Sequence, residues 1–264
     1  MRFWEDILQA KLAEVMFKKT QTPITKLKIK LKDTSATRPF RQSLTGDQVK
    51  LIAEIKQASP SKGVLCPDFQ PSKLARVYEA SGAAAISVLT DQKFFRGSLA
   101  DLELVKRATT TLPVLRKDFI IDRYQLFEAR VYGADAVLLI VAALTRPELT
   151  SYIKEAKALG MDALVEIHTF RELATALEAG AEIIGVNNRN LRTFEVNLET
   201  TFQLLESIPE DKVVVAESGF KNHHDLIRLA QAGVNAALVG EAIVSAADPG
   251  AKIKELLGGA YGSG

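Results

Sequence analysis

The chain has 264 residues, 47% of them hydrophobic, which is enough apolar material for one large α/β domain or two smaller ones. Its net charge of +2 argues against a dedicated nucleic-acid binder. Its single cysteine, Cys66, excludes an internal disulfide framework and a cysteine-rich metal site, and its three histidines do not favour a zinc site. Because no apolar run approaches the ~20 residues of a membrane span and the first residues are too acidic for a signal peptide, we expect a cytoplasmic protein that binds no membrane.

The N-terminal segment combines apolar residues at helical spacing with a basic stretch. Trp4 and Leu8 belong to the helical pattern. Residues 25–32 alternate strictly between polar and apolar side chains, which predicts a short strand or an extended arm. Residues 18–41 hold eight Lys or Arg against one acidic residue, Asp33, without interleaved aromatic residues. We interpret this stretch as a solvated arm that steers an anionic substrate, in preference to a nucleic-acid or membrane site.

The first predicted strand places an acid and a base on one face. Glu54 and Lys56 are two residues apart, and side chains two apart in a strand point the same way. Burying either charge is costly unless the two are paired or used in chemistry. The loop that follows suits an anion, because Ser59 and Ser61 can donate hydrogen bonds and Lys62 adds charge. Taken alone, the stretch also fits a surface ion pair at the end of a strand.

Eight β-rich apolar runs recur along the chain, and each is followed by a segment with helical periodicity. The predicted strands are residues 51–56, 84–89, 113–117, 134–140, 163–167, 182–187, 212–217 and 236–240. Strict alternation of apolar strands with helices indicates a parallel sheet covered by helices. Eight such units favour a closed barrel, a fold that typically takes about 250 residues.

We therefore predict an α/β protein, a (β/α)8 TIM barrel with an N-terminal helical extension. Residues 1–50 form the extension, a helix plus a basic arm packed on the barrel, residues 51–257 form the barrel, and residues 258–264 form a flexible tail. The alternative is an open doubly wound sheet. It is less favoured, because the Gly-rich dinucleotide fingerprint of that fold does not follow the first strand.

Polar side chains gather at the C-terminal ends of the predicted strands, where barrel enzymes place their chemistry. The residues concerned are Glu54, Lys56, Lys117, Glu166, Asn187 and Glu217. We expect them to be catalytic, because two lysines and three glutamates in one cavity perturb one another in the way that acid–base catalysis requires. No Ser–His pair suggests acyl transfer, and for His168, two residues after Glu166, we favour a structural role.

The loops after the last two strands suit a phosphate group. In barrels these loops often bind phosphate through backbone N–H groups, and here they carry Ser218, Gly219, Gly240 and Glu241. The glycines allow the backbone to approach an anion closely, whereas the carboxylate of Glu241 has to point away. The remaining walls are apolar and aromatic and suit a flat aromatic ligand. They comprise Phe95 (or its neighbour Phe94), Phe119, Leu138 and Leu191.

Six stretches of the sequence resemble the indole-3-glycerol-phosphate synthase family. They are residues 53–63, 90–98, 115–119, 164–168, 184–191 and 215–219, they occur in order, and the resemblance extends from residue 50 to residue 257. It implies a carbon–carbon carboxy-lyase of tryptophan biosynthesis that needs no cofactor and no metal. Such an enzyme converts 1-(2-carboxyphenylamino)-1-deoxyribulose 5-phosphate to indole-3-glycerol phosphate and releases carbon dioxide and water.

The resemblance also implies roles for the polar residues. Lys117 would be the general acid that protonates the carbonyl-derived oxygen during ring closure, and Glu166 would transfer a proton during dehydration. Lys56 would hold the anthranilate carboxylate or itself donate a proton, and Glu54 would tune Lys56 or serve as a base. The remaining implied roles are orientation of the ribulose hydroxyls and the ring nitrogen by Asn187 and Glu217, contact with the carboxylate by Arg189, and contact with the phosphate by Ser59, Ser218, Gly219, Gly240 and Glu241.

The resemblance leaves ligand contacts outside the barrel and the partners less well defined. The family carries an N-terminal helix over the barrel mouth, so Trp4 or Leu8 could touch the ligand. We expect a small phosphorylated, anthranilate-derived substrate, no nucleic acid, a monomer or a homodimer, and scope for contact with other tryptophan-pathway enzymes. Phosphoribosylanthranilate isomerase, an alternative, would need a Cys/Asp pair at strand ends, whereas Cys66 lies beyond the first loop. A binding barrel without activity would lack the catalytic residues that are present here.

Overall fold

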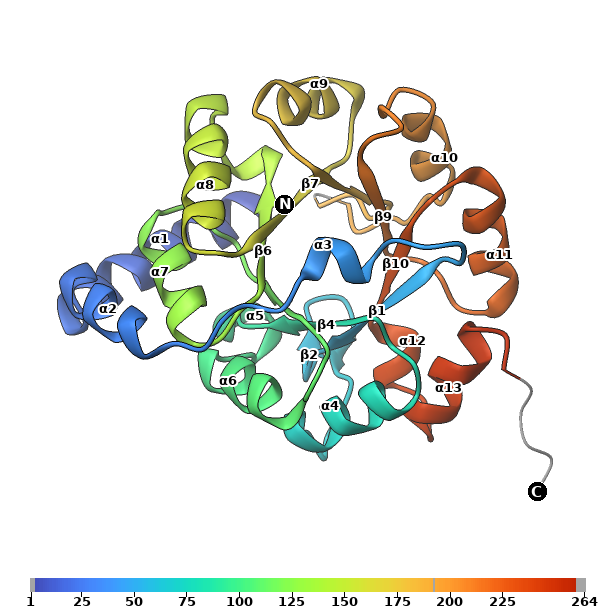
Figure 1. Ribbon diagram of the computed structural model, residues 1–264, viewed down its shortest axis with the longest axis horizontal. Helices are drawn as coiled ribbons and strands as arrows, with labels where there is room; N and C mark the ends of the chain where they lie inside the picture. The colour runs from blue at the N-terminus through green and yellow to red at the C-terminus, as the bar shows by residue number, and fades with distance from the viewer. Residues whose placement is uncertain (1–2, 192, 260–264) are drawn as a thin grey trace.

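A computed structural model describes residues 3–191 and 193–259 and shows a closed barrel of eight parallel strands (Figure 1). The strands are β1 (Lys50–Ile55), β4 (Ala85–Leu89), β5 (Val114–Lys117), β6 (Ala136–Ile140), β7 (Asp162–Ile167), β8 (Ile183–Asn187), β9 (Val213–Glu217) and β10 (Ala236–Val239). Neighbours in the chain pair in order, and β1 closes the ring against β10. The predicted barrel is therefore confirmed, the open sheet is excluded, and each predicted strand matches an observed one to within two residues.

Helices follow the strands and cover the outside of the barrel (Figure 1). The longer ones are α4 (Pro71–Ala80), α6 (Leu99–Ala108), α7 (Tyr124–Val131), α8 (Arg146–Ala158), α9 (Phe170–Glu178), α10 (Glu199–Leu205), α11 (His223–Ala232) and α13 (Pro249–Leu256). The short elements are α5 (Gln92–Phe95), the 3-10 helix η2 (Val141–Ala143), α12 (Glu241–Val244) and the antiparallel pair β2 (Ala58–Ser59) and β3 (Gly63–Val64).

Side chains at the helix ends explain where helices begin and stop. Thr169 and Asn222 cap α9 and α11, because each side chain accepts a backbone N–H of the first turn. Gly233 ends α11 with a φ of 89°, a left-handed conformation that favours glycine. Beyond α13, residues 260–264 of the predicted tail lie outside the described part of the chain. None of the helices described is both long enough and apolar enough to cross a membrane.

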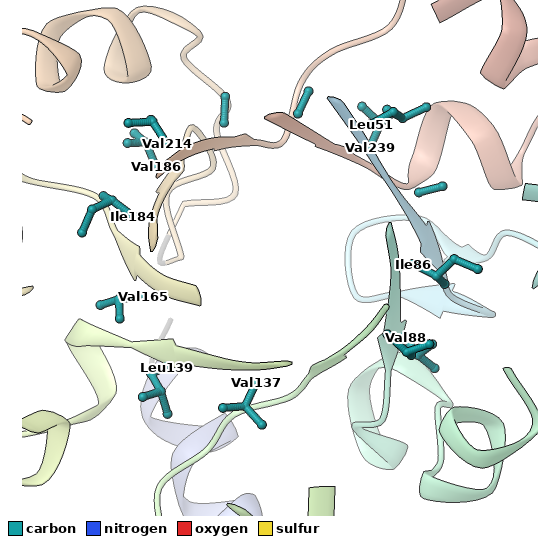
Figure 2. Close-up of a cluster of buried hydrophobic side chains, with 14 of the residues drawn as sticks. Leu51, Ile86, Val88, Val137, Leu139, Val165, Ile184, Val186, Val214 and Val239 are labelled. Atoms are coloured by element: carbon teal, nitrogen blue, oxygen red, sulfur yellow. The ribbon is translucent and has the colours of Figure 1, made fainter. Parts of the chain in front are cut away.

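Side chains alternate along each strand between the surrounding helices and the barrel interior. In β1, Leu51 and Ala53 belong to the core between strands and helices, whereas Ile52 belongs to the interior core. Figure 2 shows the outward layer, in which Leu51 and Val88 point away from the ring of strands. The same alternation turns Glu54 toward the interior, where it lines a cavity.

The N-terminal end of the barrel is closed by a short helix, α3 (Phe40–Ser43), which lies across the ring of strands in Figure 1. Phe40 and Leu44 are fully buried there and pack with interior residues of three strands, Ile52, Ala85 and Leu115. Filling this end with large apolar side chains leaves the opposite end, where the strands' C-termini lie, for the polar residues.

Residues 25–32 do not form the predicted strand or extended arm. After α1 (Phe3–Gln21), this segment is helical and belongs to α2 (Ile24–Lys30) and the 3-10 helix η1 (Leu31–Asp33). Leu27 is buried, and Ile24 and Leu31 pack with it in a cluster that includes α7 side chains. These three residues recur at helical spacing, so a helix buries them together, whereas an alternating strand would have buried Ile29, which is 64% exposed.

Candidate active site

A cavity of about 880 Å³ opens at the C-terminal ends of the strands. The predicted site residues on its wall are Glu54, Lys56, Phe95, Lys117, Phe119, Leu138, Glu166, Asn187, Arg189, Leu191, Glu217, Ser218, Gly219, Gly240 and Glu241. Ser59 does not line the cavity. It lies in β2, where its buried hydroxyl has no hydrogen-bond partner among the described residues, while Ser61 from the same loop reaches the wall.

Lys117, the last residue of β5, is held between two buried carboxylates. Its Nζ lies 2.8 Å from Oε2 of Glu217 and 3.5 Å from Oε2 of Glu166. Burial would lower the pKa of Lys117, but the charges of Glu217, Glu166 and Glu54 outweigh it and raise this pKa above its ordinary value. Lys117 is therefore an ammonium ion that can give its proton to a stronger base.

Glu217, at the end of β9, is the carboxylate most affected by its surroundings. Burial raises its pKa, Lys117 lowers it, and Glu166 and Glu54 raise it again, which brings it to about 7 from an ordinary 4.5. Gly185 of the neighbouring strand makes room for this carboxylate, because a Cβ there would lie 2.4 Å from Oε1 of Glu217. Glu217 can thus gain or lose a proton near neutral pH beside Lys117.

A second acid–base pair faces the same cavity from β1. Nζ of Lys56 lies 2.8 Å from Oε1 of Glu54, whose side chain is 4% exposed. Gly240, which follows β10, provides the space for this carboxylate, since a Cβ there would lie 2.3 Å from Oε1 of Glu54. Glycine at the end of a strand is common for packing, and Gly240 has that role here.

Basic residues surround the side of the cavity beyond β9 and β10. Ser218 adopts a left-handed φ of 68°, which is uncommon for a residue with a side chain and recurs at functional sites. Lys62 forms an ion pair with Glu241, and this pair lowers the pKa of Glu241 although burial opposes it. Lys221 and Lys252 line the same wall. The Lys62 pair neutralises the carboxylate that the sequence predicted to be unfavourable near an anion.

Aromatic side chains from α1 and the barrel loops roof the cavity. Trp4 lines it and meets Phe119 edge-on at 5.9 Å between ring centroids. Phe95 lies 6.2 Å from Phe119 and lines the cavity, whereas its neighbour Phe94 does not. Of the two N-terminal residues predicted to approach a ligand, Trp4 is on the wall and Leu8 is not.

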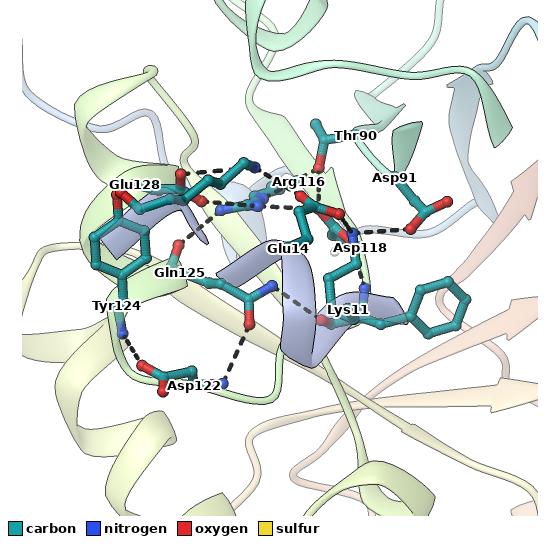
Figure 3. Close-up of polar contacts among 12 residues, drawn as sticks. Lys11, Glu14, Thr90, Asp91, Arg116, Asp118, Asp122, Tyr124, Gln125 and Glu128 are labelled. Carbon is teal, nitrogen blue, oxygen red and sulfur yellow. Dashed lines mark hydrogen bonds and ion pairs between the residues drawn. The ribbon is translucent and has the colours of Figure 1, made fainter. Parts of the chain in front are cut away.

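A buried ion cluster fastens α1 to the barrel next to Lys117 (Figure 3). Nζ of Lys11, on α1, lies 2.8 Å from carboxylate oxygens of Glu14, Asp91 and Asp118. Asp118 also accepts a hydrogen bond from the buried Arg116 at 2.9 Å. Lys11 is 1% exposed, and the three carboxylates raise its pKa although burial acts against them. The cluster ties the helix that carries Trp4 to the residue that follows Lys117.

Several residues of the site were not predicted from the sequence. Phe3, Ile7 and Phe194 line the cavity, as do Lys221 and the α13 lysine Lys252. Lys11 does not line the cavity. Its burial could not be predicted from the neighbouring sequence, because its partners Asp91 and Asp118 lie far along the chain. Within residues 3–191 and 193–259, no group of three or more His, Cys, Asp or Glu side chains is placed to hold a metal ion.

Comparison with known proteins identifies the relatives of this chain. The family model described as indole-3-glycerol phosphate synthase matches residues 4–256. The protein of that name from Alkaliphilus metalliredigens is 44% identical over 256 residues, which cover 97% of this chain and 98% of the relative. Its counterpart from Chlorobium limicola is 49% identical over 245 residues, which cover 92% and 95%.

Solved structures of more distant proteins share the fold. Thiamine phosphate pyrophosphorylase from Pyrococcus furiosus superposes with a TM-score of 0.61 at 18% identity, covering 83% of this chain and 96% of that one. KGPDC from Streptococcus mutans gives a TM-score of 0.60 at 14% identity, covering 80% and 96%. At such low identity the similarity concerns the barrel alone.

Proposed function

Because the chain belongs to the indole-3-glycerol phosphate synthase family, we propose that its barrel cavity is the active site and that the two lysine–glutamate groups described above perform the chemistry. The enzyme converts 1-(2-carboxyphenylamino)-1-deoxyribulose 5-phosphate to indole-3-glycerol phosphate in tryptophan biosynthesis, with loss of carbon dioxide and water. The observation that carries the residue assignment is the position of Lys117 between Glu166 and Glu217.

Ring closure needs an acid at the ketone oxygen of the substrate. As the aromatic ring carbon attacks the ketone, the oxygen develops the charge of an alkoxide, a much stronger base than the carboxylates that hold Lys117. The proton then passes from Nζ of Lys117 to that oxygen, despite the raised pKa of the lysine. The ammonium charge of Lys117 is fixed in place by Glu166 and Glu217, so it stabilises the developing alkoxide without reorganisation.

Decarboxylation restores the aromatic ring once the new carbon–carbon bond has formed. Lys56 is placed to hold the carboxylate as the substrate binds, because its Nζ reaches the cavity beside Glu54. Arg189 lines the same cavity and offers a second cationic contact. The electrons of the breaking carbon–carbon bond flow into the ring, and carbon dioxide leaves without a charge for the site to stabilise.

Dehydration completes the indole and needs both an acid and a base. A lysine protonates the departing hydroxyl, and Glu166 takes the proton that the five-membered ring loses. Asn187, at the end of β8, is paired in register with Glu217 at the end of β9. Together the two residues orient the ribulose hydroxyls and the ring nitrogen of the substrate. The pKa of Glu217, about 7, lets this residue share protons with Lys117 during the cycle.

The substrate's phosphate belongs at the basic wall beyond β9 and β10. Lys62, Lys221 and Lys252 supply positive charge there, and Ser218 and Gly219 supply backbone N–H groups. The aromatic roof formed by Trp4 and its neighbours suits the anthranilate ring. We do not expect Ser59 to contact the phosphate directly. Ser61 and Lys62 of the same loop line the cavity, whereas Ser59 does not.

The setting of the enzyme in the cell is part of this proposal. We infer a cytoplasmic enzyme that binds the small phosphorylated substrate. The enzyme works as a monomer or a homodimer and can contact other enzymes of the tryptophan pathway. The absence of any membrane-crossing helix among the described residues is consistent with that location.

The activity is tested by supplying the carboxyphenylamino-deoxyribulose phosphate to the protein and following indole fluorescence together with carbon dioxide release. Equal amounts of the two products are expected, and heat-unfolded protein provides the control. Carbon dioxide without an indole product, or no reaction by the folded protein, would contradict the proposal. The isomerase alternative lacks its acid, because Cys66 does not line the cavity.

A further inference from the structure

The reaction consumes one proton per turnover when the substrate binds with its carboxylate ionised. The ketone oxygen gains one proton during ring closure and the departing hydroxyl gains another, while the ring returns only one to the site. Carbon dioxide carries no proton away. One proton must therefore reach the lysines from solvent in every cycle.

Behind Glu166, on the side away from Lys117, lies a histidine. Oε2 of Glu166 faces Lys117 at 3.5 Å, and Oε1 of Glu166 lies 3.4 Å from Nε2 of His168. Both facing atoms are buried, and neither has a hydrogen-bond partner among the described residues. Buried polar atoms are usually hydrogen-bonded, and unpaired ones can mark a catalytic role.

The other face of His168 leads toward solvent. Its Nδ1 lies 3.4 Å from Oε2 of Glu172 in the first turn of α9, and that oxygen also accepts the backbone N–H of His168 at 2.6 Å. Exposure of the side chains rises along the series, from 2% for Glu166 to 14% for His168 and 22% for Glu172. The histidine thus connects a buried base with the protein surface.

The charges around His168 favour its protonated form. Carboxylates face it from β7, α9 and β9, namely Glu166, Glu172 and Glu217, while the Lys117 ammonium lies on the far side of Glu166. Burial lowers the pKa of His168, but these carboxylates outweigh it and raise the pKa above the ordinary 6.5. The raised pKa favours the imidazolium, the form that carries the proton the site needs.

We propose that His168 is the residue through which solvent protons return to the active site. The imidazolium gives the proton on Nε2 to Oε1 of Glu166, the carboxyl group then turns about its Cγ–Cδ bond, and the same proton passes to the neutral amine of Lys117. The imidazole that remains turns its unprotonated nitrogen to the side of Glu172, takes a proton there from solvent, and turns back toward Glu166. No other bond changes, and one proton has moved from solvent to Lys117. This role deepens the proposed function and rests on it.

Two substitutions separate proton transfer from packing. In His168→Gln the amide can still donate a hydrogen bond to Glu166, but it carries no proton. In Glu172→Gln the amide oxygen still accepts the His168 backbone N–H, but the negative charge is lost. Glu148→Gln is the matched control, because Glu148 occupies the same capping position in α8, pairs with Thr145, and lies outside the cavity.

The kinetic signature follows from the order of the steps. Proton return comes after the irreversible loss of carbon dioxide, so His168→Gln should lower kcat by about tenfold or more and leave kcat/KM near the wild-type value. Free imidazole should restore kcat in His168→Ala, where the ring's space is open. Glu172→Gln should move the alkaline loss of kcat to lower pH, because the pKa of His168 falls without that carboxylate. Glu148→Gln should match the wild type.

Two results would overturn the proposal. One is a wild-type kcat in His168→Gln. The other is an equal fall of kcat and kcat/KM without rescue by imidazole in His168→Ala, which would indicate a structural role. Far-ultraviolet circular dichroism and the unfolding midpoint establish that each variant is folded. Failure of the wild-type protein to turn over the substrate would instead refute the proposed function, so the two failures are distinguishable.

Discussion

Lys117 and its two carboxylates set the proton balance of the site, and Glu217 makes that balance depend on pH. The folded protein keeps a proton on Glu217 up to about pH 7, whereas an unfolded chain releases it near 4.5. The folded state therefore binds more protons in this window, so the contribution of Glu217 to stability falls as pH rises from 4.5 to about 7.

Glu217→Gln should remove this dependence. The amide keeps the shape of the side chain and cannot ionise, so the free energy of unfolding should fall less between pH 5 and pH 8 than it does in the wild type. Urea unfolding at both pH values measures the difference. Identical pH dependence in the two proteins would show that Glu217 titrates normally in the folded state.

A substitution at Gly240 tests whether activity depends on the exact position of the Glu54 carboxylate. Its φ of −119° is allowed for alanine, so Gly240→Ala introduces no backbone strain and acts through the Cβ alone. That Cβ would lie 2.3 Å from Oε1 of Glu54 and has to displace the carboxylate from Lys56. We expect kcat/KM to fall by about 100-fold, as small misplacements of catalytic groups do. Unchanged kcat/KM in a folded variant would show that the Glu54–Lys56 geometry is not needed.

At the level of elements, the docking of α1 depends on one buried lysine. Replacing Lys11 by methionine keeps the length of the side chain and leaves Glu14, Asp91 and Asp118 without their shared cation. Removing one partner from a buried ion pair typically costs about 3–5 kcal/mol. We expect Lys11→Met to release α1 from the barrel, to raise KM, and to lower the free energy of unfolding by that order.

Trp4, the single tryptophan of the chain, reports on this docking directly. Its fluorescence should shift to longer wavelength in Lys11→Met as the indole becomes exposed. Lys19→Met is the matched control on the same helix, because the Lys19–Asp122 ion pair is at the surface, where such pairs contribute about 1 kcal/mol or less. An unchanged Trp4 spectrum in Lys11→Met would mean that packing alone holds α1.

The elements also show where sequence patterns are reliable. The strand before Glu54 could be predicted because its apolar run is bounded by polar residues on both sides. The stretch 25–32 could not, because Leu27 satisfies both an alternating and a helical pattern, and only contact with α7 decides between them. Likewise, Lys11 looks like a solvent-exposed helical lysine until Asp91 and Asp118 are brought to it by the fold.

For the whole molecule, the repeating order of strands and helices determined most of the site. A parallel barrel brings all strand ends to one mouth, so residues such as Lys117, Glu166 and Glu217 could be predicted to converge without knowledge of any distance. The loop residues that close the cavity, Phe194 and Lys221 among them, were not predicted, because loops have no periodicity and their side chains reach the wall only through the fold.

The central claim is that Lys117, held between Glu166 and Glu217, supplies the proton for ring closure. The most direct test is kcat of Lys117→Met at saturating substrate, beside the wild type and Lys157→Met. Lys157 is the control, because its ion pair with Glu182 is exposed and lies outside the cavity. We predict a loss of about 100-fold to 10,000-fold for Lys117→Met and none for Lys157→Met. A folded Lys117→Met protein with wild-type turnover would contradict the account.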